Sequence, residues 1–320
     1  VKRMVSTKNA LILKPSGNPM PLIGLGLWKV PKDKTANVVF DALEIGYRLL
    51  DNAADYGNEK EVGDGIKKAI EHKIVRREDI FVTSKLWNTN HKREHVRPAL
   101  ERTLKDLGLD YLDLYLIHFP VSLKYVDNPV WTKDSPQDDA TIRETWEAME
   151  ELVDAGLVKN IGLSNFCASL IMDILKYARI RPAVLQIEHH PYLTQETLIK
   201  YVQSQGISIT AYSSFGNQSF LELSGEVGKM ASTTPSLFEQ DIISEIASNY
   251  KKTPAQVLLR WAFQRGIAIV PKSSNRGRLT ENIDILDFSL TEVELHRISS
   301  LNRGLRFNDP AIYANIPIFD

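Results

Sequence analysis

Four side chains with acid–base chemistry stand at or just beyond the ends of three successive apolar runs. Asp51 closes the run YRLLD, Tyr56 lies just beyond it, Lys85 lies near the end of IFVTSKL, and His118 directly follows YLDLYLI. A tyrosine with a pKa near ~10 is a poor acid at neutral pH, and a nearby lysine cation is expected to lower that pKa. A carboxylate at Asp51 could hold Lys85 charged, and His118 could hydrogen-bond a carbonyl oxygen. The set is suited to giving a proton to a developing alkoxide.

Each of these residues also has an ordinary structural explanation. A buried carboxylate such as Asp51 is about as often part of a structural ion pair, and a lone histidine after a strand usually packs. Coincidence is a poor explanation for four such residues on three successive strand ends. We therefore predict an active site there, with Tyr56 as the proton donor.

The apolar runs are short and alternate with longer helical patterns. We predict strands at 23–27, 47–52, 80–86, 111–117, 158–163, 184–188, 207–212 and 266–270, and helices at 33–45, 58–72, 92–107, 142–155, 168–178, 194–204, 238–250 and 254–264. Short runs rich in Ile, Val and Leu are typical of buried parallel strands. Eight such units predict an α/β fold, a (β/α)₈ TIM barrel, with an open doubly wound sheet as the alternative. In a barrel, the carboxyl ends of the strands carry the active site.

Segments outside this alternation are expected to cover the ends of the barrel. Residues 11–22 predict a β-hairpin with a Ser-Gly-Asn turn that plugs one end. Long loops at 119–141 and 213–237 on the carboxyl-terminal face predict lids or binding loops. The tail 301–320 is expected to fold over the barrel mouth.

Bulk composition excludes several classes of protein. The 320 residues carry a formal net charge of −1, so nothing favours nucleic acid or an anionic membrane as a partner. The single Cys167 excludes an internal disulfide and indicates a reducing compartment. No apolar run has the length of a bilayer span, and no signal-peptide core follows the N-terminus. We expect a cytoplasmic protein with one domain, 1–320, in which residues 1–10 are disordered and the native start is Met4.

Two short motifs in the sequence do not indicate a binding site. The segments GLG at 24–26 and GDG at 63–65 begin a G-x-G pattern, but lysine stands where the third glycine is needed, so no Rossmann fingerprint is present. The run EHH at 188–190 resembles a set of metal ligands, yet no zinc-binding motif accompanies it. We expect no metal, and a metal-dependent barrel hydrolase using these histidines and His118 stays as an alternative.

Three longer segments resemble the signatures of the aldo-keto reductase family. They are GYRLLDNAADYGNEKEVG at 46–63, LGLDYLDLYLIHFP at 107–120 and VPKSSNRGRLTEN at 270–282, and their order and spacing fit the family over essentially the whole chain. Within the family the chain is most similar to the yeast xylose (aldose) reductases. That similarity rests on AADYGNEKEVGDG at 53–65, HHPYL at 189–193, AYSSFGNQSF at 211–220 and GLRFNDP at 304–310.

The resemblance implies a catalytic tetrad of Asp51, Tyr56, Lys85 and His118, and NAD(P)H bound across the strand ends. It implies cofactor contacts at Ser164, Asn165 and Gln186 for the carboxamide, Tyr212 stacked on nicotinamide, Lys272, Ser273 and Arg278 on the 2′-phosphate, and Glu281 and Asn282 on the adenine. It places Glu222 on the loop that covers the adenosine, and it adds Ser213 and Ser274 as further cofactor-binding residues. It implies a sugar pocket of Trp28, Asp55, His118, Phe119 and Asn308.

One position departs from the family pattern. Yeast xylose reductases that also use NADH carry Asn directly after the Lys-Ser pair, where this chain has Ser274 and places Asn at 275. Glu222 could accept hydrogen bonds from the ribose hydroxyls of NADH, or it could be an exposed loop charge. We expect NADPH to be preferred, with NADH as the second choice.

The resemblance implies reduction of D-xylose to xylitol, because Asp55 and Asn308 suit an open-chain polyol. Reduction of other small aldehydes or ketones is one alternative, and a non-catalytic, cofactor-binding barrel subunit is another. The resemblance also implies a small-molecule substrate and a homodimer.

Overall fold

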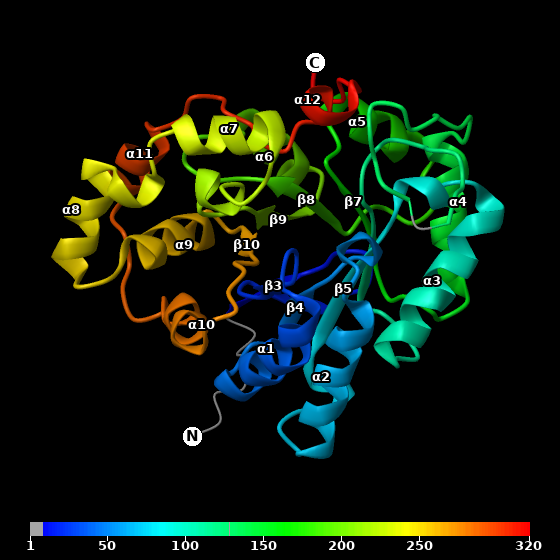
Figure 1. Cartoon of the computed structure of the whole chain (residues 1–320), viewed down its shortest axis with the longest axis horizontal. Helices are drawn as coiled ribbons and strands as arrows, with labels where there is room; N and C mark the ends of the chain where they lie inside the picture. The colour runs from blue at the N-terminus through cyan, green and yellow to red at the C-terminus, as the bar shows by residue number, and fades with distance from the viewer. Residues whose placement is uncertain (1–8, 128) are drawn as a thin grey trace.

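The chain folds into a ring of parallel strands surrounded by helices (Figure 1). The computed structural model describes residues 9–127 and 129–320. The ring consists of β3 Leu25–Gly26, β4 Leu49–Asp51, β5 Phe81–Leu86, β6 Leu114–Ile117, β7 Ile161–Ser164, β8 Val184–Glu188, β9 Ser208–Tyr212 and β10 Ala268–Ile269. Each strand pairs in parallel with the next one along the chain.

Closure of the ring decides between the two predicted architectures. Ile23 bridges Ile269 in parallel, and the Gly24 amide donates to the Ile269 carbonyl over 2.8 Å, so the last strand meets the first. A Cβ at Gly26 would collide with the Val270 carbonyl, so glycine permits this close approach. The (β/α)₈ barrel is confirmed, and the open sheet is excluded.

The eight predicted helices are present, with ends that differ by at most a few residues. They are α1 Lys32–Ile45, α2 Glu59–Glu71, α3 Arg93–Leu107, α4 Ile142–Asp154, α5 Ala168–Tyr177, α6 Glu196–Ser204, α8 Asp241–Tyr250 and α9 Pro254–Gln264. The start of α9 shows why the boundaries are readable. Thr253 accepts from the Gln256 amide, and the Gln256 side chain accepts from the Thr253 amide, which forms a capping box.

The described chain has four further α-helices in segments for which the sequence predicted a loop, an irregular tail or no element. They are α7 Gly225–Thr233 within the loop predicted at 213–237, α10 Arg276–Ile283, α11 Glu292–Ser299 and α12 Pro310–Ala314 in the tail. In Figure 1, α12 lies above the strands on the same side as α7, and the two helices are in contact. The tail therefore folds over the barrel mouth as predicted, but as a helix.

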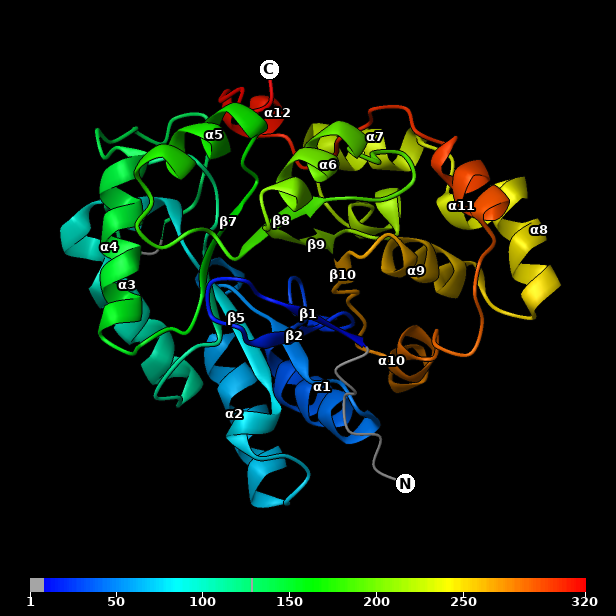
Figure 2. The ribbon, with the colours of Figure 1, turned by 180° about the vertical axis from the view of Figure 1, so that it is seen from behind.

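An antiparallel hairpin covers the opposite end of the barrel (Figure 2). Its strands are β1 Ala10–Ile12 and β2 Pro19–Pro21, and the turn places Gly17 in the left-handed region with φ of 77°. Leu13 and Met20 pack against apolar side chains that point down from the barrel strands. The predicted plug is confirmed. The disorder expected for residues 1–10 is wrong for Ala10, which pairs with Pro21, and residues 1–8 lie outside the described part.

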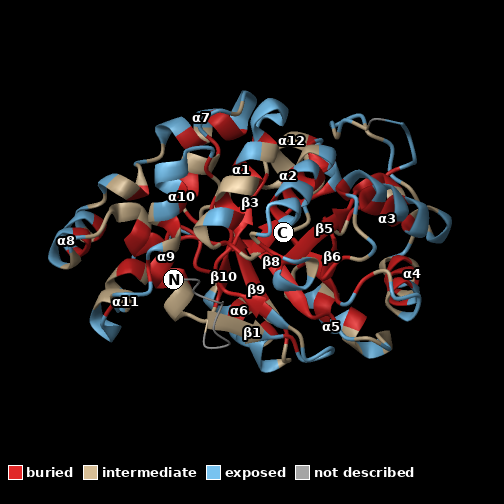
Figure 3. Cartoon of the chain, turned by 90° about the horizontal axis from the view of Figure 1, so that it is seen from below, coloured by how far each residue is buried: buried red, intermediate tan, exposed pale blue. Residues whose placement is uncertain are grey.

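Burial follows this architecture closely. The strands of the barrel are buried except at the two ends of β9, and the helices present a buried face inward and an exposed face outward (Figure 3). Across residues 9–127 and 129–320, no helix combines the length and the apolar character that crossing a membrane requires.

Candidate active site

A cavity of about 1490 Å³ opens at the carboxyl ends of the strands. It is lined by every residue that the sequence analysis assigned to the site except Lys85, which lies fully buried beneath its floor. The side chains come from the ends of at least five strands, so the barrel brings together residues that are far apart in the chain. This is the face on which barrels carry their chemistry.

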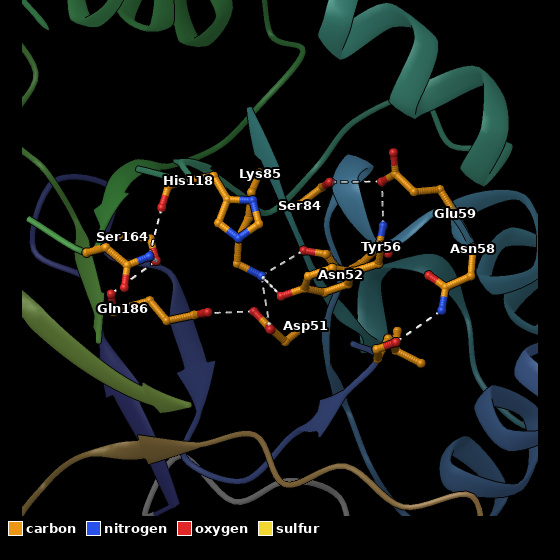
Figure 4. Close-up of polar contacts among 12 residues, drawn as sticks. Asp51, Asn52, Tyr56, Asn58, Glu59, Ser84, Lys85, His118, Ser164 and Gln186 are labelled. Carbon is orange, nitrogen blue, oxygen red and sulfur yellow. Dashed lines mark hydrogen bonds and ion pairs between the residues drawn. The ribbon is translucent and has the colours of Figure 1, made fainter. Parts of the chain in front are cut away.

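The four tetrad residues meet at the floor of this cavity (Figure 4). The Lys85 ammonium donates to Asp51 Oδ2 over 3.0 Å and to the Tyr56 hydroxyl over 2.9 Å. Its third partner is the Asn52 carbonyl, at 2.9 Å. Because β4 and β5 are neighbours, Asp51 and Lys85 reach each other directly, whereas Tyr56 is brought in by the 3₁₀ helix Ala54–Tyr56. The expected Asp51–Lys85 pair is present.

The pKa of Tyr56 differs from the value expected for a tyrosine beside a lysine cation. Burial first, and then the carboxylates of Asp51 and Asp55, raise the pKa of Tyr56 well above its ordinary value. Burial lowers the pKa of Lys85, and the Asp51 carboxylate in contact with it opposes that shift. The predicted lowering of the tyrosine pKa is therefore wrong for this state. Tyr56 holds its proton at neutral pH, which suits a proton donor.

His118 is neutral in its surroundings. Burial and then the Lys85 cation lower its pKa well below the ordinary value. Its ring packs edge-on against Tyr56, with centroids 6.0 Å apart, and stacks on Phe119 at 5.1 Å. A neutral imidazole on the cavity wall can donate one hydrogen bond to a carbonyl oxygen.

Asp55 lies beside Tyr56 and lines the same cavity. Its carboxylate is open to the cavity but surrounded by protein on most sides, and this desolvation raises its pKa to about 6, with Lys85 opposing the shift. Asn308 reaches the cavity from the tail, where its side chain donates to the Tyr212 hydroxyl over 3.0 Å and accepts from Tyr313 over 2.9 Å. Asp55 and Asn308 thus add polar groups to a pocket that also contains Trp28 and Phe119.

The residues predicted for the nicotinamide region form one hydrogen-bonded group. Asn165 donates to the His118 carbonyl over 2.9 Å and accepts from the Tyr212 hydroxyl, and Ser164 donates to the Gln186 carbonyl over 3.1 Å. Gln186, predicted to face the carboxamide, also donates to Asp51 Oδ1 over 2.8 Å. Ser213, next to Tyr212 on the cavity wall, adopts φ of 55°.

A strap after β9 crosses the cavity at Glu222. The Glu222 carboxylate is 2.6 Å from Lys29 Nζ and 3.8 Å from Lys272 Nζ. Lys29 follows β3 and Lys272 follows β10, so the strap is tied to two other strand ends. The hydrogen bond and charge of Lys29 lower the pKa of Glu222. Glu222 is therefore not an isolated charge on an exposed loop.

The remaining predicted cofactor residues surround the start of α10. Ser273 is buried and accepts from the Asn275 amide over 3.0 Å, and Asn275 caps the helix by accepting from the Arg278 amide over 3.0 Å. Ser274, Arg278, Glu281 and Asn282 line this end of the cavity. Arg276 points elsewhere and pairs with Asp41 and Glu44. Among the described residues, Arg278 makes no ion pair, so its guanidinium faces the cavity uncompensated.

Several cavity residues were missed from the sequence. The ring of Trp87 packs edge-to-face against His118 and Trp131, with centroids 5.3 Å and 5.9 Å apart. Trp131 packs in the same way against Tyr313, with centroids 5.4 Å apart. Trp87 could have been found, because it lies two residues beyond Lys85 at the same strand end. Trp131 and Tyr313 come from a loop and the tail, where no periodic pattern assigns a direction.

The run Glu188-His189-His190 has a structural role. The Glu188 carboxylate accepts from His190 Nε2 at 3.1 Å, from the Phe307 amide at 3.0 Å and from the Asn308 amide at 2.7 Å. His189 stacks on Trp261 at 4.8 Å. This buried cluster anchors the tail that carries Asn308.

Comparison with known proteins agrees with this arrangement. Residues 22–303 match the model of the aldo/keto reductase family. The chain is 56% identical over 311 residues to a sequence named probable NAD(P)H-dependent D-xylose reductase from Emericella nidulans, covering 95% of this chain and 96% of that one. It is 53% identical over 315 residues to the NAD(P)H-dependent D-xylose reductase I,II of Candida tropicalis, covering 95% and 96% of the two chains. The crystal structure of a Bombyx mori aldo-keto reductase in complex with NADP matches with a TM-score of 0.86 and 39% identity, covering 96% and 98%. Together with the barrel and the Asp51–Lys85–Tyr56 contact at its mouth, these matches show that the chain belongs to the aldo/keto reductase family.

Proposed function

We propose that this protein reduces the open-chain aldehyde of an aldose, D-xylose to xylitol, with NAD(P)H as the reductant. The observation that carries the proposal is the Tyr56 hydroxyl held 2.9 Å from the buried Lys85 ammonium at the floor of the cavity. The names of the relatives from Emericella nidulans and Candida tropicalis support the substrate and the cofactor.

The residues of the cavity fit a nicotinamide dinucleotide. The cavity extends from Tyr56 to Arg278, and the far end offers the cations Lys272 and Arg278 beside the N-terminus of α10, where a phosphate group is favoured. Near the tetrad, Ser164, Asn165 and Gln186 offer hydrogen-bonding groups and Tyr212 offers an aromatic ring. When bound, the cofactor supplies the hydride.

The chain's own residues handle the proton. Tyr56, protonated at neutral pH, gives its proton to the oxygen that becomes a hydroxyl. Lys85 then lies against the phenolate and stabilises it, and Asp51 keeps that ammonium charged and oriented. Neutral His118 hydrogen-bonds the carbonyl oxygen and polarises it.

The proposed substrate pocket combines polar and aromatic walls. Asp55 and Asn308 accept or donate hydrogen bonds to sugar hydroxyls, while Trp28 and Phe119 pack on the carbon chain. The cluster of Trp87, Phe119 and Trp131 also favours a second candidate function, reduction of aromatic or apolar aldehydes.

The proposed cofactor order is NADPH before NADH. Lys272 and the uncompensated Arg278 favour a 2′-phosphate, and Ser274 stands where the NADH-using pattern has Asn. Because Glu222 pairs with Lys29 and Lys272, it is less free to bind the ribose hydroxyls of NADH. Glu281 and Asn282 are proposed to face the adenine.

One assay separates these possibilities. Loss of NADPH absorbance is followed with xylose, glyceraldehyde and benzaldehyde, and again with NADH. The proposal predicts turnover of xylose with both cofactors and a higher kcat/KM with NADPH. Turnover of benzaldehyde alone would favour the second candidate, and no turnover with any carbonyl would favour a binding subunit.

We also infer a cytosolic enzyme that acts on a small molecule, without nucleic acid as a partner, and that forms a homodimer. The formal net charge of −1 supports the absence of a nucleic-acid partner. Sedimentation of the purified protein tests the dimer directly, since a monomeric mass would overturn it.

A further inference from the structure

Beside the tetrad lies a buried carboxylate to which the proposed mechanism gives no role. Glu59, the first residue of α2, is only 6% exposed. Its oxygens accept hydrogen bonds from Asn52 Nδ2, from Ser84 Oγ at 2.8 Å and from Thr103 Oγ1 at 2.8 Å. Within the part of the chain that the structure describes, no lysine or arginine forms an ion pair with it. Burial of such a carboxylate is costly, so its three donors and its position need an explanation.

The bond from Asn52 to Glu59 closes the loop that carries Tyr56. Asn52 directly follows β4, and Glu59 opens α2, so the segment between them is held at its base. Figure 4 shows Glu59 on the side of Tyr56 away from Ser164, with Ser84 joined to it by a hydrogen bond. Because Tyr56 has no strand of its own, the position of its hydroxyl depends on how this base is fixed.

The same carboxylate ties that loop to β5. Ser84 immediately precedes Lys85 on the strand, and one Glu59 oxygen, Oε2, accepts from both Ser84 and Asn52. Asn52 is also held from the opposite side, because its carbonyl accepts from Lys85 Nζ at 2.9 Å and its amide donates to Thr83 at 3.0 Å. Glu59 therefore joins the element that carries the proton donor to the element that carries its cation.

We infer that Glu59 is a positioning residue for proton transfer: it fixes the Tyr56 loop against β5 and adds a second negative charge that favours the Lys85 ammonium. This rests on the proposed function, in which Tyr56 gives the proton and Lys85 stabilises the phenolate. Thr103, on α3, completes the coordination of the carboxylate from outside the barrel.

The charges around Glu59 determine the sign of its effect on pH dependence. The groups that face it or share its surroundings are Lys85 on β5, Asp51 on β4, Tyr115 on β6, Asp106 and Arg102 on α3, and Asp55 and Tyr56 in the loop. Burial raises the pKa of Glu59, and its hydrogen bonds from Thr103, Ser84 and Asn52 oppose that shift. An ionised Glu59 favours the protonated forms of Lys85 and Tyr56, so neutralising it should lower the pKa at which the pair loses its proton.

The test is the pH profile of kcat/KM for NADPH-dependent xylose reduction in Glu59→Gln, with Thr103→Val as the matched control. Glu59→Gln keeps the shape of the side chain and removes its charge. We expect the alkaline limb to move down by on the order of half a pH unit or more, and kcat/KM at neutral pH to fall roughly tenfold. Thr103→Val removes one of the three hydrogen bonds to Glu59 but leaves its negative charge in place. This control variant should therefore have a lower melting temperature and an unchanged alkaline limb of the pH profile.

A second pair of variants covers the case in which Glu59→Gln does not fold. Ser84→Ala removes the tie to β5, and Thr103→Val removes the tie to α3, each by one hydroxyl. The inference predicts a larger loss of kcat/KM for Ser84→Ala at similar stability. Equal losses in the two variants, or a Glu59→Gln enzyme with lowered stability and an unmoved pH profile, would reduce Glu59 to a structural role.

Failure of this inference can be told from failure of the proposed function. The Tyr56→Phe variant is measured in parallel. If that variant retains wild-type turnover, or the unmodified enzyme reduces no carbonyl, the proposed function itself is wrong. If Tyr56→Phe is inactive while Glu59→Gln behaves like the unmodified enzyme, only the assignment of Glu59 fails.

Discussion

At the scale of single residues, the site sets one buried ammonium between a carboxylate and a phenol. Lys85 has no exposed surface, and its three hydrogen bonds go to Asp51, Asn52 and Tyr56. The sequence allowed this group to be predicted, because strand ends converge in a barrel. The raised pKa of Tyr56 could not be predicted, because it depends on the depth of burial and on two carboxylates, one of which was assigned to the sugar.

The hierarchy within the tetrad is testable by paired substitutions. Lys85→Met removes the cation that contacts Tyr56 and should lower kcat/KM at least ~100-fold, whereas Asp51→Asn acts only through Lys85 and should cost less. Steady-state kinetics of both variants at one pH measures the order. An Asp51→Asn enzyme much the poorer of the two would reverse the order of importance of Lys85 and Asp51.

The ionisation of Asp55 should appear in substrate affinity. Burial raises its pKa to about 6, so its carboxylate is present above that pH and is lost as the pH falls through it. If the carboxylate accepts hydrogen bonds from sugar hydroxyls, KM for xylose should rise by roughly tenfold or more as the pH falls through this range, because a hydrogen bond to a charged group contributes about 1.5–3 kcal/mol. KM for benzaldehyde should change little. An Asp55→Asn enzyme that keeps the same pH dependence would assign it to another group.

At the scale of elements, the adenosine end of the cavity depends on one short helix. Arg276 and Arg278 lie on α10, but Arg276 pairs with Asp41 and Glu44 on α1, whereas Arg278 lines the cavity. Arg278→Ala should weaken NADPH binding by about 1.5–3 kcal/mol and leave NADH nearly unchanged. Arg276→Ala, the matched control, should leave both cofactors unchanged. Titration by protein fluorescence measures all four affinities, and equal weakening of the two cofactors by Arg278→Ala would show that the phosphate contact is misplaced.

Helix α10 also shows why some helices cannot be predicted from the sequence. Strong periodicity made α1 to α6, α8 and α9 predictable to within a few residues, and side-chain caps at Thr141 and Thr253 mark the starts of α4 and α9. In α10 only Leu279 and Asn282 are buried, so its sequence RGRLTENI has no apolar stripe to detect. In α7, the sequence GEVGKMAST contains two glycines, which disfavour a helix, and packing against the tail overrides that preference.

At the scale of the whole molecule, two ends of one barrel have different tasks. The upper end carries the cavity, and the lower end is closed by the hairpin, whose buried residues fill the space below the strands. Ring closure could only be offered as the favoured alternative from the sequence. It depends on the pairing of β10 with the segment around Ile23, which is a contact between residues 246 apart in numbering (269 − 23).

The plug predicts an asymmetry in stability along one hairpin. Met20 is 1% exposed beneath the barrel, and Ile12 is 54% exposed on the partner strand. Met20→Ala should lower the free energy of unfolding by about 2–5 kcal/mol, whereas Ile12→Ala should change it by about 0.5 kcal/mol or less. Denaturant unfolding followed by circular dichroism compares them, and similar losses would mean that the hairpin does not seal the core.

The central claim is that Tyr56 donates the proton in a carbonyl reduction. Its most direct test is the Tyr56→Phe variant, measured for NADPH binding by fluorescence titration and for xylose reduction by loss of NADPH absorbance. The ring and its packing are kept, so NADPH affinity should be nearly unchanged, while turnover should fall at least ~100-fold because the general acid is gone. A Tyr56→Phe enzyme that binds NADPH and still reduces xylose at close to the original rate would contradict the claim.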